Sequence, residues 1–327
     1  MSMTSRLVSK MLVLDARDEQ LPSLSRVCGE QNVIGIAVRN EDLASALAEH
    51  TDLGAVLLAG DYDGSPAANE AVAAQLHALR PELPVIMQQR ERNEAAEWPL
   101  AGRQLRASYA ADDPEGLRTA IDEHVFGVTF PDALVDGIVE ITTARLRSLF
   151  TSMDVAVEAP SIVRDRIIFG EAFSLIPLEG AWCRGYMLMQ AEEEPLIATL
   201  GSAAARDREA GSVGGAGAAD FRELNSVLGE LTNLVWGAFK NRFLSEPATG
   251  TQPLVQVPLL INHRHRYISF GSDNPQLCFR YRLSGPGTAR DVVIDQRFVF
   301  SLNWSPEDFD DSGEAADAPA FGEIDLF

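Results

Sequence analysis

The sequence predicts an α/β fold with a doubly wound parallel sheet in its first part, followed by a second domain with a different pattern. The chain has 327 residues, which is more than one hydrophobic core usually accommodates. Up to residue 127, short apolar runs alternate with helix-like stretches, which is the βαβ rhythm of a parallel sheet with helices on both faces. We therefore expect an N-terminal tail over 1–9, a first domain over 10–127, a second domain over 128–304 and a tail over 305–327.

The expected strands of the first domain are short apolar runs rich in Val, Ile and Leu. They comprise residues 11–16, 33–38, 54–60 and 83–88. Between and after these runs lie stretches with helical character. They comprise residues 22–29, 41–50, 68–80 and 113–125.

Element by element, this domain resembles a response-regulator receiver. Receivers hold a divalent cation with acidic residues, accept phosphate on an Asp at the end of the third strand, and neutralise it with a Lys at the end of the last strand. This sequence departs from that pattern. Asp15 is followed by Ala16, Ala59 lies at the acceptor position, and Ala110 lies at the Lys position.

The chain contains only two lysines, Lys10 and Lys240, and neither fits the receiver position. We therefore predict a degenerate receiver that is not phosphorylated and serves as a docking or dimerising module. Asp61, two residues beyond Ala59, is the alternative phosphoacceptor.

In the second domain, residues 226–240 predict an amphipathic helix. Its apolar stripe comprises Leu224, Val227, Leu228, Leu231, Leu234, Ala238 and Phe239. Its polar face comprises Ser226, Glu230, Asn233, Gly237 and Asn241, with Trp236 at the rim. Glu230 and Asn233 are three residues apart, so both side chains can reach one partner site, and Gly237 lets another backbone come close. The alternative is an ordinary solvated helix face.

Ser226, Glu230 and Asn233 in SVLGELTN are similar to the helix signature of the CheX and CheC chemotaxis phosphatases. The similarity covers about residues 130–302 and includes a strand-like VQVPLLI, where Pro258 fits the family's usual Pro loosely. The resemblance implies an α+β domain of antiparallel sheet with long helices.

The same resemblance implies a phosphatase that hydrolyses the aspartyl phosphate of a CheY-type response regulator. Asn233 would orient a water molecule, and Glu230 would engage the partner's active-site Lys. Ser226, Trp236 and Gly237 would support the helix or contact the partner. The Mg²⁺ ion would come with the substrate receiver, so we expect no cofactor and no metal site in this chain.

An internal repeat accompanies this motif. Asp136, Glu140 and Thr143 repeat the spacing of Ser226, Glu230 and Asn233. Because Thr143 replaces the amide, we predict that this second motif is degenerate and that Glu140 is an ordinary exposed acid.

Composition excludes several other classes of function. A net charge of -21 argues against binding to nucleic acid or to an anionic membrane. The three cysteines have no metal-site spacing, and with no leader segment they are typical of a cytoplasmic protein. No apolar run is long enough to cross a bilayer.

The composition of two segments predicts that they are unstructured. Residues 202–219 are rich in Gly and Ala and predict a flexible insertion. Residues 305–327 carry eight acidic residues and no basic one, which predicts a disordered tail. Ile324, Leu326 and Phe327 at its end form a short docking motif, and the alternative is a solubilising tail.

A rival from another class is a non-catalytic adaptor that binds signalling or flagellar proteins without hydrolysis. A third possibility, a receiver whose own phosphate is removed by the attached domain, is disfavoured by Ala59 and Ala110. The sequence leaves open whether the protein forms a homodimer.

Overall fold

The computed structural model describes most of the two predicted halves. The described residues are 7–15, 17, 20–38, 43–60, 62, 66–89, 105–164, 172–180, 182–200, 221–244, 259–262, 274–285, 290–300, 309 and 311. None of the helices in these ranges combines the length and apolarity needed to span a bilayer.

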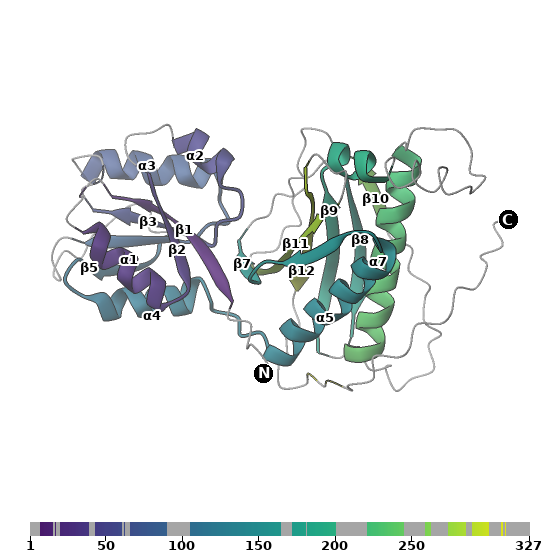
Figure 1. The fold of residues 1–327 in the computed structure, drawn as a ribbon. Helices are drawn as coiled ribbons and strands as arrows, with labels where there is room; N and C mark the ends of the chain where they lie inside the picture. The colour runs from purple at the N-terminus through teal and green to yellow at the C-terminus, as the bar shows by residue number, and fades with distance from the viewer. Residues whose placement is uncertain are drawn as a thin grey trace, which may run out of the picture.

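The first half of the chain contains a parallel sheet with the strand order β2-β1-β3-β4-β5 (Figure 1). Its strands are β1 (Val8–Leu14), β2 (Val33–Val38), β3 (Ala55–Ala59), β4 (Val85–Gln89) and β5 (Leu105–Ala110). Every residue of β3 is buried, as expected for a central parallel strand that is covered on both faces.

Helices cover both faces of this sheet. They are α1 (Leu21–Glu30), α2 (Leu43–Glu49), α3 (Pro66–Leu79) and α4 (Pro114–His124). One apolar cluster joins α1 and α4 to the sheet, and a separate cluster joins α2 and α3 to it. The first turn of α4 is well specified, because the Asp113 carboxylate accepts a hydrogen bond from the Gly116 amide at 3.0 Å and Pro114 follows it.

The second half contains an antiparallel sheet with the order β10-β8-β9-β12-β11, and β11 also pairs with β6 and β7. Its elements are α5 (Asp132–Leu149), β6 (Asp154–Val157), β7 (Ser161–Val163), β8 (Ala172–Glu179), β9 (Arg184–Ala191), α7 (Phe221–Phe243), β10 (Leu259–Asn262), β11 (Gln276–Ser284) and β12 (Val292–Phe300). A further helical stretch covers residues 193–200.

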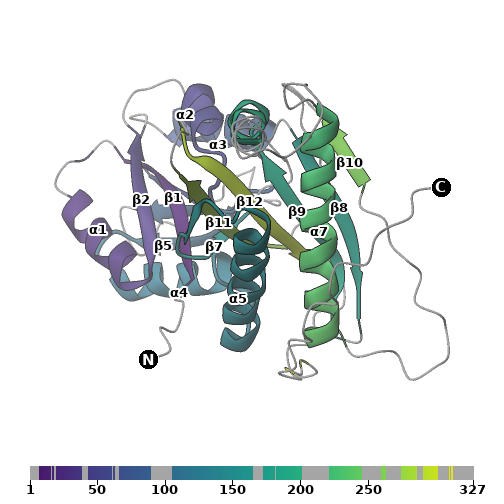
Figure 2. The same ribbon diagram turned by 45° about the vertical axis from the view of Figure 1, so that its right-hand side comes forward.

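The two long helices, α5 and α7, pack beside each other on one face of the antiparallel sheet (Figure 2). Their apolar sides share one core with alternate residues of the strands, including Met187 and Met189 of β9. Gly137 of α5 permits the close approach of the helices, because a Cβ atom there would lie 2.5 Å from the ring of Phe243 on α7.

The two sheets are joined into one twelve-stranded sheet, because Val8 and Ser9 at the start of β1 pair in parallel with β7. Val8 donates its amide to the Pro160 carbonyl at 3.0 Å, and the Ser9 hydroxyl donates to the Ile162 carbonyl at 2.8 Å. Gly54 lies against this junction. A Cβ atom there would collide with the Ser9 hydroxyl and lie 3.3 Å from the Ile162 carbonyl oxygen.

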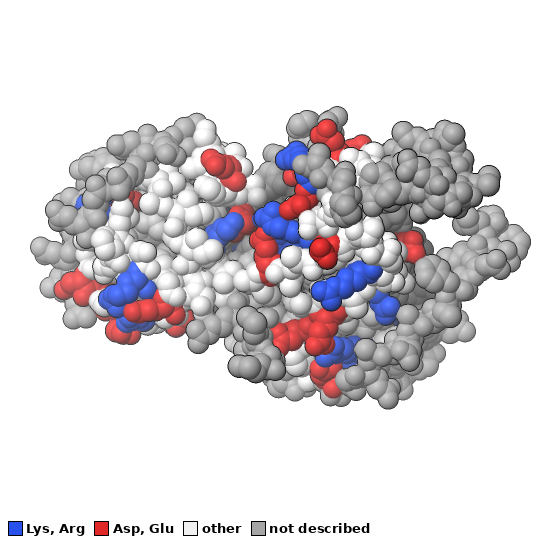
Figure 3. Space-filling model, in the orientation of Figure 1, with Lys and Arg blue, Asp and Glu red and all other residues white. Residues whose placement is uncertain are grey.

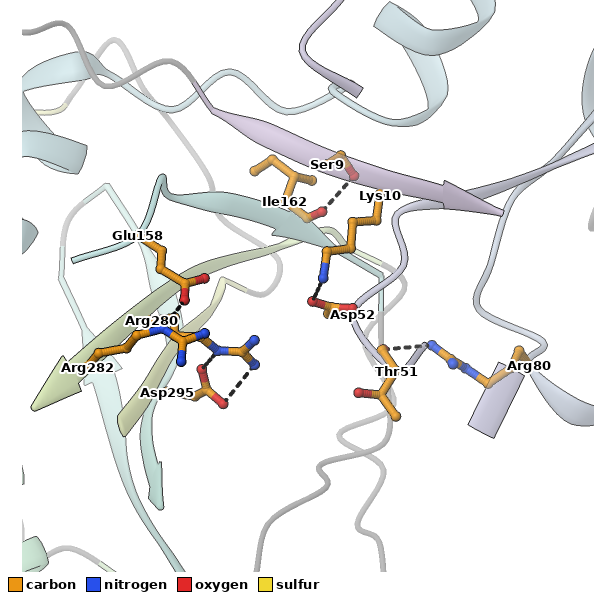
Figure 4. Close-up of polar contacts among 10 residues, drawn as sticks. All are labelled: Ser9, Lys10, Thr51, Asp52, Arg80, Glu158, Ile162, Arg280, Arg282 and Asp295. Atoms are coloured by element: carbon orange, nitrogen blue, oxygen red, sulfur yellow. Dashed lines mark hydrogen bonds and ion pairs between the residues drawn. The ribbon is translucent and has the colours of Figure 1, made fainter. Parts of the chain in front are cut away.

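Charged side chains from both halves line this junction (Figure 4). Lys10 pairs with Asp52 at 2.5 Å, and Arg280 pairs with Asp295 through contacts of 2.7 and 3.2 Å. Burial is the largest single influence on Asp52 and opposes its ionisation. The hydrogen bond from Lys10 and the positive charges of Lys10 and Arg280 together outweigh burial and keep the pKa of Asp52 below its ordinary value. The hydrogen bonds to Asp295 raise the pKa of Arg280.

The mixed sheet agrees with the predicted succession of parallel and antiparallel strands, whereas the identification of the first half as a receiver stays a prediction. The sequence did not predict the pairing of β1 with β7. The predicted insertion at 202–219 lies outside the described residues.

The predicted disordered tail differs from the structure at its start. Phe309 packs against Trp182 and Phe243, with ring centroids 5.2 and 5.5 Å away. Asp311 accepts hydrogen bonds from Arg242 at 2.9 and 3.0 Å. This part of the acidic segment is ordered because one aromatic ring and one ion pair attach it to α7.

Candidate functional site

Helix α7 carries the predicted site and is long, with 23 residues. Glu223 lies in its first turn, and Lys240 and Arg242 lie in its last turn. These charges interact favourably with the helix dipole and stabilise the helix. The residues of α7 that are buried in the core are Leu224, Leu228, Leu231, Val235, Phe239 and Phe243. The predicted stripe was therefore wrong at one position, because Val235 enters the core and Leu234 is only half-buried.

The opposite face of α7 is open to solvent. Ser226, Glu230, Asn233 and Asn241 are all exposed. Glu230 and Asn233 are separated by about 4.5 Å along the helix axis at 1.5 Å per residue and lie on neighbouring positions of one face. A carboxylate and a carboxamide therefore lie side by side on the exposed face, and neither has a hydrogen-bond partner among the described residues.

A buried threonine fixes the rotation of α7 about its axis. Thr232 is fully buried, its hydroxyl lies within hydrogen-bonding distance of the equally buried Ser174 hydroxyl on β8, and it donates to the Leu228 carbonyl at 2.7 Å. Because Thr232 faces the sheet, the residues on each side of it, at 230 and 233, must face away from the sheet. The sequence analysis missed Thr232, and its position between Glu230 and Asn233 was the available signal.

Trp236 and Gly237 lie one turn beyond Asn233. Trp236 is partly buried against the core, and the Lys240 ammonium group lies 5.6 Å from the centre of its ring. Gly237 is half-buried, yet an added Cβ atom would lie more than 4 Å from every described residue outside its own helical segment. Among the described residues, no other element covers the surface above Gly237.

The corresponding motif on α5 is arranged differently. Glu140 is exposed but pairs with Arg242 of α7 at 2.9 Å, and Arg242 also binds Asp311. The hydrogen bonds to these two acids raise the pKa of Arg242, that of Asp311 more strongly. Glu140 is thus an exposed acid, and α7 supplies a guanidinium group beside it.

Asp136 and Thr143 complete the α5 motif without forming a second site. Asp136 is half-buried, and the Thr143 hydroxyl is buried with no hydrogen-bond partner among the described residues. Thr142, which corresponds to Thr232 in α7, is fully buried and donates to Gln296 of β12 at 3.0 Å. The repeat therefore retains the anchoring threonine and lacks an exposed amide.

In the first half, the position of a receiver active site is occupied by side chains of the protein itself. Asp15, at the end of β1, is fully buried and accepts two hydrogen bonds at 3.0 Å from the Arg17 guanidinium group. Ala59 and Ala110 are buried at the ends of β3 and β5. A guanidinium cation thus neutralises the carboxylate that would contribute to metal binding in a receiver.

Several predicted residues lie outside the described residues. They are Asp61, Pro258, Ile324, Leu326 and Phe327. Among the residues that are described, no group of three or more His, Cys, Asp or Glu side chains is placed to hold a metal ion. On the face drawn in Figure 3, the basic side chains of the second half lie interspersed with acidic ones.

The three cysteines are buried and have free thiols. Burial raises the pKa of Cys28 to about 11 and that of Cys183 to about 12. The thiols of Cys28 and Cys183 are therefore protonated packing groups at neutral pH and have no nucleophilic character there.

Comparison with known proteins gives similarity at the level of solved structures. No protein-family model and no curated protein matches the chain. A chemotaxis protein CheX from Desulfovibrio desulfuricans matches 51% of this chain and 99% of its own, with 12% identity and a TM-score of 0.36. A CheC-like superfamily protein from a Shewanella species matches 52% and 99%, with 18% identity and a TM-score of 0.35. A chain of a CheX-CheY-BeF3-Mg²⁺ complex from Borrelia burgdorferi matches 52% and 98%, with 12% identity and a TM-score of 0.31.

Proposed function

We propose that this protein is a phosphatase that hydrolyses the aspartyl phosphate of a separate receiver protein of the CheY type. The observation that carries the proposal is the pair Glu230 and Asn233, exposed together on α7 while Thr232 between them is bound to the sheet. An exposed acid and amide that have no hydrogen-bond partner among the described residues are available for a partner. The similarity of SVLGELTN to the CheX and CheC helix signature supports this assignment.

The mechanism depends on positioning. When α7 docks against a phosphorylated receiver, the Asn233 amide holds a water molecule in line with the phosphorus atom of the acyl phosphate. Orienting the attacking water lowers the activation free energy because it removes the entropy cost of bringing nucleophile and phosphoryl group together. The water-positioning glutamine of GTPases acts by the same principle.

Glu230 supplies the electrostatic part of the interaction. Its carboxylate pairs with the lysine that a receiver uses to hold the phosphoryl oxygens, and this ion pair places Asn233 over the phosphate. The Mg²⁺ ion that offsets the charge of the phosphoryl group belongs to the substrate receiver, so this chain contributes side chains and no metal.

The α5 motif does not take part in this reaction. Its glutamate is paired with Arg242 and its Thr143 hydroxyl is buried, so neither group can bind a partner's lysine or orient a water molecule. We assign α5 a structural role in holding α7.

The test is the rate of dephosphorylation of CheY-type receivers that carry a labelled aspartyl phosphate. We expect the wild-type protein to accelerate hydrolysis, and the Asn233→Ala and Glu230→Ala variants to lose the acceleration. Asn241→Ala is the matched control, because Asn241 is exposed on the same helix about two turns beyond Asn233. Asn241→Ala and Glu140→Ala should retain the activity.

The same experiment separates the phosphatase from an adaptor. A receiver that binds this protein without losing phosphate faster would establish binding without catalysis, and the adaptor function would replace our proposal. The charge-neutralised Asp15 in the first half is the observation that favours an adaptor, since that half has lost a catalytic arrangement while keeping its fold.

A further inference from the structure

A crevice in the first half of the protein lies outside the α7 site. Its volume is about 270 Å³, and it opens between α1 and α4 next to the carboxyl ends of β4 and β5. The lining residues are Gln20, Ser23, Leu24, Val27, Gln88, Tyr109, Ala111, Asp112, Pro114 and Leu117. In open parallel sheets, ligands bind at the carboxyl ends of the strands.

Two buried polar side chains form the floor of the crevice. Gln88 is 2% exposed and Tyr109 is 5% exposed, although both carry groups that need hydrogen-bond partners. Gln88 lies within hydrogen-bonding distance of Arg17, Gln20 and Tyr109. The polar groups are therefore connected in one network.

The network fixes which atoms donate. Arg17 can only donate hydrogen bonds, so the carbonyl oxygen of the Gln88 amide must face it. The Gln88 NH₂ group then donates to the Gln20 Oε1 atom at 2.8 Å and to the Tyr109 hydroxyl oxygen at 3.1 Å. The NH₂ group of Gln20 and the hydroxyl proton of Tyr109 have no acceptor among the described residues.

These donors stay available at neutral pH. Burial raises the pKa of Tyr109 well above its ordinary value, so the phenol keeps its proton. Among the described residues, no lysine or arginine lines the crevice, while Asp112 lies exposed at its mouth and the chain as a whole is acidic. An anionic ligand would be repelled, and an uncharged hydrogen-bond acceptor would not.

The remaining walls are apolar. Leu24 and Val27 of α1 are on one side, and Pro114 and Leu117 of α4 are on the other. The volume of about 270 Å³ lies just below the range of about 300 to 1,000 Å³ that is typical of sites for drug-sized ligands, so the crevice suits a smaller ligand with apolar faces.

From these observations we infer that this crevice is a binding site for a small uncharged ring compound, which accepts hydrogen bonds from the Gln20 amide and the Tyr109 hydroxyl through a carbonyl or ring acceptor. The site lies at the edge of the sheet where a receiver would bind phosphate and metal. Here the side chains that face a ligand are uncharged hydrogen-bond donors. The inference is independent of the phosphatase function of α7.

The test uses nicotinamide as a neutral probe and nicotinate as its anionic counterpart, with the full-length protein. Binding is followed by saturation-transfer NMR and by titration. We expect millimolar binding of nicotinamide and at least tenfold weaker binding of nicotinate. Tyr109→Phe removes one hydrogen bond and should weaken nicotinamide binding about 5- to 10-fold.

A second variant does not depend on the buried network. Ser23 is exposed at the mouth, so Ser23→Trp should fold normally, block the crevice and abolish binding. The inference is overturned if nicotinamide does not bind the wild type, if nicotinate binds equally well, or if Tyr109→Phe and Ser23→Trp bind nicotinamide as the wild type does.

Discussion

Gly237→Ala is the substitution that best tests the role of the exposed face of α7. A glycine inside a helix lowers stability by about 0.8 to 1.0 kcal/mol relative to alanine. In this protein, the added Cβ atom would meet no other atom within 4 Å, so the fold itself does not require glycine at 237. The variant should therefore gain about 1 kcal/mol of unfolding free energy, or about 2 to 4 °C in Tm for a unit of this size.

Under the proposed function, the same methyl group lies where the receiver's backbone approaches α7. We expect Gly237→Ala to lower kcat/KM for receiver dephosphorylation at least tenfold while raising thermal stability. These opposite effects distinguish a contact with a partner from damage to the fold, because damage would lower both quantities.

Gly29→Ala is the matched control. Gly29 lies in α1, and a Cβ atom there would also meet nothing within 4 Å. It should stabilise the protein without affecting dephosphorylation. If Gly237→Ala stabilises the protein and leaves kcat/KM unchanged, close approach at Gly237 is refuted; if it destabilises the protein, our description of the α7 surface is wrong.

Three further predictions concern the interior. Thr232→Val leaves the buried Ser174 hydroxyl without its partner, so urea denaturation should show a loss of about 1 to 3 kcal/mol in unfolding free energy. The double variant with Ser174→Ala should recover most of this loss. An unchanged denaturation midpoint for Thr232→Val would contradict the anchoring role. Gly54→Ala places a methyl group against Ser9, so we expect a loss of about 1 to 3 kcal/mol in unfolding free energy. Adding Ser9→Ala should recover part of this loss. A denaturation curve unchanged by Gly54→Ala would argue against the β1–β7 junction. In the folded protein the pKa of Cys28 is raised from 9.0 to about 11. The contribution of Cys28 to stability is therefore complete below pH 9 and is lost as the pH rises towards 11. Between pH 9 and 11, the unfolding free energy of Cys28→Ala should therefore fall less steeply than that of the wild type.

The sequence predicts four of the five strands of the first half, because each of these four is a short apolar run next to a helical stretch. Strand β5 (Leu105–Ala110) was missed, because its sequence LRASYA alternates apolar and polar residues instead of forming an apolar run. The rotation of α7 was predicted less well. Leu234 and Val235 are adjacent and both apolar, so periodicity alone cannot choose which of them enters the core. The choice depends on the hydrogen bond between Thr232 and Ser174, which are 58 residues apart in the sequence.

Contacts between residues far apart in the sequence could also not be predicted from the sequence pattern. Ser9 and Ile162 form the junction across 153 residues, and neither has a feature that identifies the other. The same holds for the hydrogen bond between Arg17 and Gln88, which are 71 residues apart, although Arg17 also binds the nearby Asp15 carboxylate at the end of β1. The candidate site on α7 could be predicted because its residues lie within one helix, where spacing in the sequence is spacing in the structure.

The joined sheet has a consequence for how α7 meets a receiver. Helix α7 packs on β8 and β9, whereas the first half begins at β1, and the strands β7, β11 and β12 lie between them. From β1 to β8 there are five strand spacings of about 4.8 Å, which is roughly 24 Å across a continuous sheet. The first half cannot reach the exposed face of α7 without breaking the pairing of β1 with β7. Under the proposed function, Glu230 and Asn233 would therefore act on a receiver that belongs to another molecule, and this geometry argues against a protein that hydrolyses its own phosphate.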